Sequence, residues 1–244
     1  MIAAIGSAPD LQLVGVEAYE GGVKAPTPEE VWAGIDRLLD LMLAVFDHGR
    51  QSGAFAKGEE IILSAGSSTS FDQVIRRFGH LSKDKGVRIV TRGGAFLALD
   101  HGFYKRRALD MDKRGALDLP GGKKGSASGF KPGLELWAAV QSMPDPQMAI
   151  MGMGMRDLPY DIELPIPLQR FRDGKLIEDL GPDWKMTKSN DQHCYVEYPK
   201  GADIRIGDIL SFGISHTSTA FDKWDVVWRI ADDFTVTGAL KTFF

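Results

Sequence analysis

The stretch Glu60-Ile-Ile-Leu-Ser-Ala-Gly-Ser-Ser-Thr69 decides the fold class of this 244-residue chain. A short apolar run, Glu60–Ser64, leads directly into a turn of small residues, Ala65–Thr69, and then into a helical segment around Phe71–Phe78. An apolar strand that passes through a glycine turn into a helix is typical of a parallel sheet whose faces are covered by helices. The sequence therefore predicts an α/β unit here.

Two similar strand–helix units flank this stretch. Upstream, the apolar run Leu11–Ala18 is followed by a helix that begins at Thr27, with proline at its first position, and ends near Gly49. A capping hydroxyl, an early proline and apolar residues at 3.6-residue spacing are the usual signals of such a helix. Downstream, the strand Val87–Thr91 is followed by the glycine turn Arg92–Ala95.

The pattern changes after about residue 105. A loop rich in glycine, serine and lysine covers Gly121–Gly129, and beyond this loop we expect short β strands but no long helix. The β runs are Leu134–Val140, Met148–Met151, Cys194–Tyr198, Ile209–Gly213, Trp224–Ile230 and Phe234–Leu240. The chain therefore divides into an α/β part and a C-terminal β part, with the boundary between about 105 and 133.

Composition and charge limit the class of protein. The 29 basic and 33 acidic side chains give a net charge of −4, which argues against nucleic acid or an anionic membrane as the main partner. The single cysteine, Cys194, cannot form an internal disulfide, and no apolar run reaches the roughly 18 residues of a membrane span. With no recognisable leader at the N-terminus, we expect a cytoplasmic protein.

The two glycine turns are the first candidate for a binding site. Ala65–Thr69 and Arg92–Ala95 both follow parallel strands, so their backbone N–H groups and hydroxyls lie at one end of the sheet. Such groups surround phosphate in many α/β proteins. The alternative is that these loops contain glycine and serine only because they turn.

Histidines supply the second candidate. His216 and Ser218 share a face if their segment is extended, but serine is a poor zinc ligand. His193 and Cys194 are adjacent, so in a strand they point to opposite faces and cannot share one metal. Spacing alone therefore favours structural roles for these histidines and for His101.

Seven segments spread along the chain form a common pattern. They are Val16–Gly21, Ser64–Thr69, Arg92–Phe96 with Asp100–Gly102, Phe130–Trp137, Arg156–Asp161, Asn190–His193 and Ser215–Trp224. Together they resemble the D-serine dehydratase/D-threonine aldolase family, in particular its bacterial amino acid deaminase branch. The resemblance covers nearly the whole chain.

This resemblance implies an alanine-racemase-type fold that forms a dimer. Residues 1–110 would be a partial (β/α) barrel with about the last three strand–helix units, since a complete barrel takes about 250 residues. Residues 111–244 would be the C-terminal β domain. The exposed edge of a cut barrel would need a partner, either the missing N-terminal portion of the barrel or a second copy of the chain.

The resemblance also implies a site. Pyridoxal phosphate would be the cofactor and a small D-amino acid the substrate. The segments that match the cofactor's phosphate site contain Ser67, Ser68, Thr69, Gly94 and Ala95. Tyr19 would line the cofactor ring, and His216 with Ser218 would stand at the site of zinc or another divalent metal.

Two departures from the family limit the expected activity. The family's Schiff-base lysine lies in an Arg-Pro-His-x-Lys-Thr-like segment, and this sequence has none, so we assign no catalytic residue. Ser218 stands where the family has cysteine or aspartate. We therefore expect the C-terminal part of a pyridoxal-phosphate-dependent D-amino-acid lyase or deaminase that is inactive alone. The alternative is a non-catalytic module that binds a phosphate ligand or serves assembly.

Overall fold

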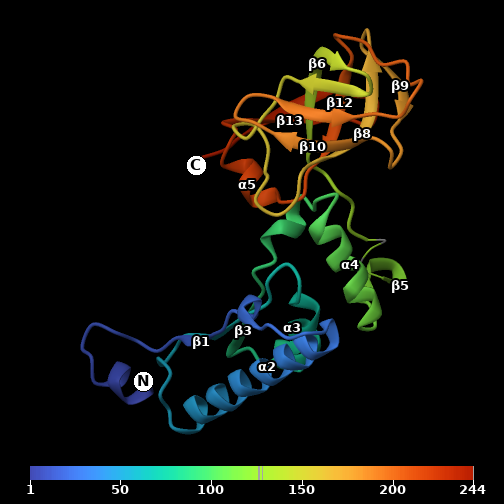
Figure 1. Ribbon diagram of the computed structural model, residues 1–244. Helices are drawn as coiled ribbons and strands as arrows, with labels where there is room; N and C mark the ends of the chain where they lie inside the picture. Colours follow the sequence, from blue (N-terminus) through green and yellow to red (C-terminus); the bar gives the residue numbers. More distant parts are fainter. Residues whose placement is uncertain (126, 128, 244) are drawn as a thin grey trace. The chain divides into compact units, whose positions relative to one another are not determined.

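The computed structural model describes residues 1–125, 127 and 129–243 and has a mixed α/β fold, as the sequence predicts (Figure 1). It forms two compact units. The N-terminal unit comprises Met1–Gly94 and Met111–Ser126, and the C-terminal unit comprises Ala95–Asp110 and Ala127–Phe244. Ser126 and Ser128 of the predicted Gly121–Gly129 loop lie outside the described residues.

The N-terminal unit contains a three-stranded parallel sheet in the order β1-β2-β3. Its main elements are β1 (Gly15–Glu17), α2 (Pro28–Gln51), β2 (Ile61–Ser64), α3 (Phe71–Phe78) and β3 (Val87–Val90). Shorter elements are α1 (Ile2–Gly6), η1 (Glu20–Gly22), η2 (Gly79–Lys83), β4 (Asp118–Leu119), η4 (Pro120–Gly122) and β5 (Lys123–Lys124). The strands and helices predicted around Glu60–Thr69 are confirmed.

Helices α2 and α3 cover one face of this sheet. Their buried side chains, among them Leu39 and Phe46 of α2, form one apolar cluster with Leu63 of β2. Ile62 and Val90 point to the opposite face, are half-buried and lie outside that cluster. In the described residues, helices thus cover one face, whereas the sequence predicted two covered faces.

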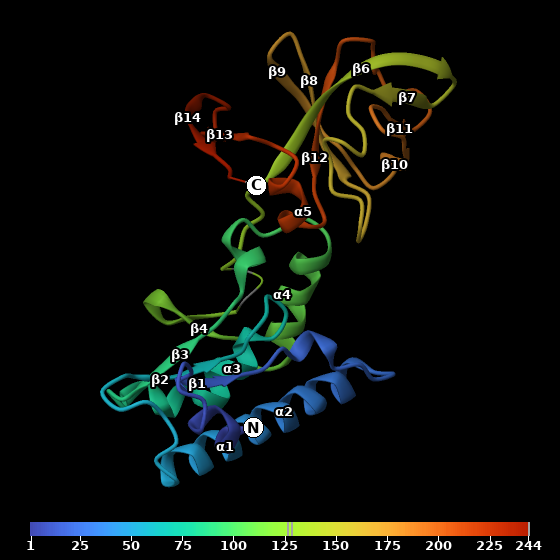
Figure 2. The ribbon, with the colours of Figure 1, turned by 90° about the vertical axis from the view of Figure 1, so that its left-hand side faces the viewer.

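The C-terminal unit contains a seven-stranded antiparallel sheet in the order β10-β11-β7-β6-β12-β8-β9 (Figure 2). The strands are β6 (Glu135–Asp145), β7 (Met148–Met151), β8 (Ile166–Arg172), β9 (Lys175–Asp179), β10 (Lys185–Ser189), β11 (Cys194–Glu197) and β12 (Ile209–Gly213). The sheet curls until β10 approaches β8 and encloses an apolar cluster with Met151, Cys194 and Phe212. The predicted strands β6, β7, β11 and β12 are confirmed, whereas β8, β9 and β10 were not predicted.

A separate hairpin follows the sheet. Helix α5 (Thr217–Phe221) leads to β13 (Val226–Ile230), which pairs only with β14 (Val236–Lys241). The Trp224 and Trp228 side chains are exposed, by 42% and 65%, so neither belongs to an apolar core.

The chain passes from one unit to the other within two helical segments, η3 (Gly94–Leu97) and α4 (Phe103–Lys113). Helix α4, which has 11 residues, was not predicted. The buried Asp100 carboxylate caps its N-terminus by accepting hydrogen bonds from the N–H groups of Gly102 and Tyr104, at 3.0 and 2.9 Å. None of the helices in the described part of the chain is long and apolar enough to cross a bilayer.

Candidate functional site

The glycine turn after β2 is organised around a buried acid. Glu20, only 1% exposed, accepts hydrogen bonds from the backbone N–H of Gly66 at 3.2 Å, from the N–H of Ser67, and from the Ser70 hydroxyl at 2.6 Å. Gly66 has a φ of +94°, a conformation that glycine adopts without strain. The loop thus already surrounds an anion, and the chain itself supplies it.

Burial alone would raise the pKa of the Glu20 carboxyl. The hydrogen bonds from the Ser70 hydroxyl and from the N–H groups of Ser67 and Gly66 outweigh burial and place the pKa below its ordinary value. The carboxylate also lies next to the N-terminus of α3, where the helix dipole favours negative charge. Glu20 is therefore ionised at neutral pH.

Hydroxyl groups and two backbone N–H groups without an acceptor also lie at the two glycine turns. The Ser67 hydroxyl lies 3.2 Å from both the Thr69 and the Ser70 hydroxyls. Within the described residues, the backbone N–H groups of Thr69 and Gly93 have no acceptor. An ideal Cβ at Gly93 would lie 3.9 Å from the Ser68 Cα, so the two glycine turns are neighbours.

Two arginines hold this region in place. Arg92 donates to the Ser64 hydroxyl at 2.5 Å and to the Ala18 carbonyl at 2.8 Å, so it ties together the ends of all three parallel strands. Arg114 donates to the Thr69 carbonyl at 3.1 Å and to the buried Asp72 carboxylate at 2.6 Å. Both guanidinium groups donate to protein acceptors, which fix their orientation beside the turn.

The structure thus brings three predicted site residues, Ser67, Ser68 and Thr69, into one loop with Glu20. Gly94 is the last residue of the first segment of the N-terminal unit, and Ala95 is the first residue of the C-terminal unit. Tyr19 directly precedes Glu20, and its side chain is 68% exposed. Glu20 lies in the segment Val16–Gly21, but sequence reasoning assigned it no role, because its partners lie 46 to 50 residues away along the chain.

A phosphate fits this loop in part. The hydroxyls of Ser67 and Thr69 and the N–H groups of Thr69 and Gly93 can donate to it. The N–H groups of Gly66 and Ser67 are taken by Glu20. The space beside Gly94 is open, since an ideal Cβ there meets no atom within 4 Å.

His216 lies in the C-terminal unit, in a cluster of polar side chains. Its Nδ1 donates to the Asp161 carboxylate at 2.5 Å, and the Thr219 hydroxyl donates to the same carboxylate at 2.7 Å. Next to it, the buried Ser215 donates to Glu163 at 3.0 Å. The bond to Asp161 fixes the proton on Nδ1 and leaves Nε2 as the available nitrogen.

The predicted metal pair fits this geometry poorly. His216 precedes the first residue of α5, and Ser218 is an exposed residue inside that helix, so the segment is not extended as their shared face requires. Among the described residues, no group of three or more histidine, cysteine, aspartate or glutamate side chains is suited to hold a metal ion. The assignment of His216 and Ser218 to a metal stays a prediction, and no chemical step is derived from it.

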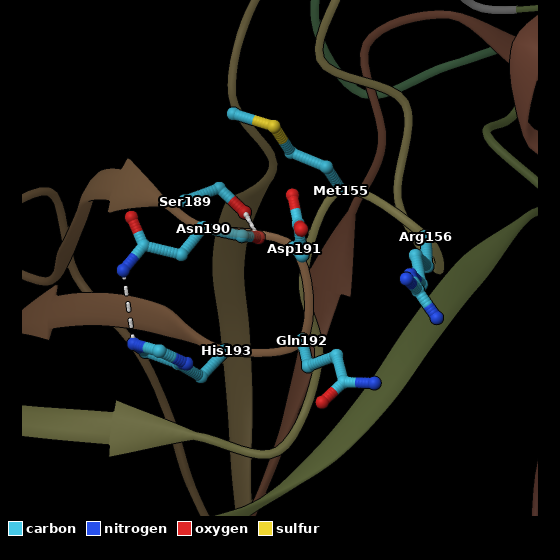
Figure 3. Close-up of a pocket in the computed structure, with 7 residues that line it drawn as sticks. All are labelled: Met155, Arg156, Ser189, Asn190, Asp191, Gln192 and His193. Atoms are coloured by element: carbon cyan, nitrogen blue, oxygen red, sulfur yellow. Dashed lines mark hydrogen bonds between the residues drawn. The ribbon is translucent and has the colours of Figure 1, made fainter.

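A polar cleft of about 580 Å³ lies at the turn between β10 and β11 (Figure 3). It is lined by Met155, Arg156, Ser189, Asn190, Asp191, Gln192 and His193. Figure 3 shows the Asn190 and His193 side chains pointing toward one another, joined by a hydrogen bond of 3.0 Å, while Arg156 and Gln192 extend to the other side of the turn. Two segments that carry the family resemblance, at Arg156 and at Asn190–His193, therefore meet here.

Cys194 follows this cleft along the chain but does not face it. The side chain is fully buried in the apolar cluster of the sheet, and burial, with a smaller effect of Asp157, raises the pKa of the thiol to about 12. A thiol with that pKa is neutral at physiological pH and a weak nucleophile. The opposite orientation of His193 and Cys194 agrees with the sequence analysis.

Comparison with known protein families finds a match within the C-terminal unit. Residues 133–230 match the family described as "Putative serine dehydratase domain". A search of curated protein sequences returned no match.

Solved structures show the same fold over nearly the whole chain. D-threonine aldolase from Filomicrobium marinum has a TM-score of 0.68 at 18% identity, over 98% of this chain and 56% of its own. D-threo-3-hydroxyaspartate dehydratase from Delftia sp. HT23 has a TM-score of 0.57 at 18% identity, over 94% of this chain and 55% of its own. An alanine racemase-like protein from Idiomarina loihiensis has a TM-score of 0.56 at 13% identity, over 94% and 55%. The chain thus spans about half the length of the structures it matches.

Proposed function

We propose that the chain is the C-terminal part of a pyridoxal-phosphate-dependent D-amino-acid lyase or deaminase, because its residues 133–230 match the serine dehydratase domain family. Two of the solved enzymes with a similar fold are a D-threonine aldolase and a D-threo-3-hydroxyaspartate dehydratase. The observation that carries the proposal is the loop Gly66–Ser70, whose donors already stabilise one anion at the end of a parallel strand.

In this proposal the N-terminal unit binds the cofactor's phosphate. The hydroxyls of Ser67 and Thr69 and the N–H groups of Thr69 and Gly93 donate to it, with Ser68, Gly94 and Ala95 in the same two turns. Tyr19 lies beside the ring. When bound, pyridoxal phosphate supplies the electron sink that stabilises a carbanion formed on an amino-acid substrate.

The C-terminal unit has a polar cluster of its own, in which the His216 Nδ1 bonds to Asp161 and Nε2 is the ring nitrogen left for a ligand. The Schiff-base lysine comes from the missing N-terminal portion of a barrel or from another chain. Without that portion we propose that this chain binds phosphate but does not turn over substrate.

Titration of the full chain with pyridoxal phosphate, followed by tryptophan fluorescence, tests the proposal. We expect saturable binding that inorganic phosphate displaces. Thr69→Val removes one hydroxyl donor and is expected to weaken binding about fivefold, the effect of one hydrogen bond. Thr187→Val is the matched control, because Thr187 is an exposed threonine on β10.

Three outcomes separate the possibilities. Displaceable binding that depends on Thr69 supports the proposed cofactor site. Equal affinity for inorganic phosphate and for pyridoxal phosphate supports the alternative, a non-catalytic module that binds phosphate ligands. An absence of saturable binding, or an equal effect of Thr69→Val and Thr187→Val, contradicts a phosphate site in this loop.

A further inference from the structure

Glu20 is a buried carboxylate without a cationic partner. The side chain is 1% exposed, and in the described part of the chain it forms no ion pair. Its charge is balanced by the N–H groups of Gly66 and Ser67, the Ser70 hydroxyl and the N-terminus of α3. A buried carboxylate is tolerated only when such donors replace its lost hydration.

These donors are of the same kind as those that bind a phosphate at the end of a parallel strand. Backbone N–H groups in a glycine turn followed by a helix are the usual phosphate-binding arrangement. Here the first two N–H groups of the turn point to Glu20. A phosphate in the same loop is therefore limited to the N–H groups of Thr69 and Gly93 and the nearby hydroxyls.

The two anions also repel one another. A carboxylate and a phosphate held by donors of one short loop are only a few ångströms apart, and their repulsion is screened weakly because Glu20 is buried. Arg114 is paired with the Asp72 carboxylate, whereas Arg92 donates to the neutral Ser64 hydroxyl and Ala18 carbonyl and lies 3.4 Å from the exposed Glu17 carboxylate. Compared with a neutral side chain at the same position, the Glu20 carboxylate lowers the affinity of the loop for any phosphate.

We propose that Glu20 is an internal competitor for the anion site of the Gly66–Ser70 loop, which limits its phosphate affinity and confines a bound phosphate to the Thr69 and Gly93 side of the turn. This inference rests on the proposed phosphate site, and it names Glu20 as the residue that limits the affinity of that site for phosphate. Glu20 is thus a positioning residue and does not take part in any chemical step.

The test uses Glu20→Gln in the full chain, with inorganic phosphate and pyridoxal phosphate as separate probes in calorimetric titrations. The substitution removes the charge and keeps the size of the side chain, so we expect both probes to bind about tenfold more tightly, or better. Glu59→Gln is the matched control, since Glu59 is an exposed acid at the other end of β2, and it should change affinity less than about twofold.

Ser70→Ala separates competition from damage to the loop. This variant loses the hydroxyl that donates to Glu20 but keeps the carboxylate, so we expect no gain in phosphate affinity. Thermal unfolding monitored by circular dichroism confirms that each variant is folded before titration. A variant with a damaged loop loses affinity, so a gain limited to Glu20→Gln is specific to competition.

The outcomes for the two proposals differ. If the unmodified chain binds pyridoxal phosphate and a folded Glu20→Gln binds it equally or more weakly, the competitor role is wrong and the proposed function stands. If only Glu20→Gln binds phosphate, the competitor role is supported and cofactor binding by the unmodified chain is contradicted. If neither binds, both proposals are contradicted.

Discussion

The Asp208→Asn variant is expected to lose about 3 kcal/mol of unfolding free energy in the C-terminal unit. Asp208 is 2% exposed and accepts hydrogen bonds from Arg170 at 3.0 Å and from Arg172 at 2.7 and 2.8 Å. The Arg170 side chain is only 3% exposed, so its charge has little access to water. Removal of the central carboxylate leaves the buried Arg170 guanidinium with Glu178, at 2.7 Å, as its remaining acidic partner. The loss of a buried partner is more costly than the loss of an exposed one.

Denaturant unfolding followed by tryptophan fluorescence measures this effect. Asp203→Asn is the matched control, because Asp203 bonds to Arg172 and Arg205 in the same network but its side chain is 60% exposed. We expect a much smaller loss for the control, since water replaces the lost contacts. Equal losses for the two variants would show that the Asp208 network does not hold the curled sheet together.

Acid is expected to destabilise the C-terminal unit through His101. Burial, with a smaller effect of Lys105, lowers the pKa of His101 from 6.5 to about 4. The ring packs against β12 so closely that a Cβ on Gly213 would lie 2.3 Å from its Cγ, and its Nδ1 is buried without a hydrogen-bond partner in the described residues. Glu135 lies 4.0 Å from Nε2, which does not offset the burial.

The direction follows from proton binding. Between pH 6.5 and about 4 the unfolded chain protonates this histidine and the folded chain does not, so stability falls as the pH is lowered. A shift of this size corresponds to about 3 kcal/mol over that range. His101→Gln removes the titrating group. When the pH is lowered from 7.5 to 4, the unfolding free energy of this variant should therefore fall by about 3 kcal/mol less than that of the unmodified chain.

Urea unfolding of both proteins at pH 7.5 and pH 4 gives this difference. Asp100, whose carboxyl pKa is raised by burial, has the opposite effect on acid stability and is present in both proteins. The comparison therefore isolates His101. Parallel pH profiles for the two proteins would show that the folded chain protonates His101 as readily as the unfolded chain does.

The sequence predicted elements that are specified locally. The start of α2 is an example, because the Thr27 hydroxyl accepts the N–H of Glu30 at 3.3 Å while the Glu30 side chain accepts the N–H of Thr27 at 3.1 Å. The parallel strands were equally visible, since their apolar runs are bounded by glycine turns. Such signals need no knowledge of the rest of the fold.

Elements stabilised by distant partners were missed. Strand β8 contains Pro167, which argues against a central strand, and the structure accommodates it where the pairing with β12 shifts register. Strand β9 is exposed along its whole length and shows no apolar alternation. Helix α4 is capped by Asp100, and a cap of this kind cannot be recognised from the spacing of apolar residues.

The candidate site shows the same division. Ser67, Ser68 and Thr69 were predicted as site residues because their turn follows a strand and because the family resemblance points to the same residues, and that assignment stays a prediction. Glu20 was missed because only the folded chain brings it to this turn. The shared face of His216 and Ser218 was inferred for an extended segment, and α5 is helical there.

Borohydride reduction in the presence of pyridoxal phosphate, followed by peptide mass spectrometry, shows whether this chain has a Schiff-base lysine of its own. We expect that the cofactor binds through its phosphate and that no lysine is labelled stoichiometrically, with only minor adducts at exposed lysines such as Lys123 and Lys124. Inorganic phosphate should not change that pattern. A single lysine labelled to one equivalent, and protected by phosphate, would show that this chain has its own Schiff-base site and is not limited to binding the phosphate.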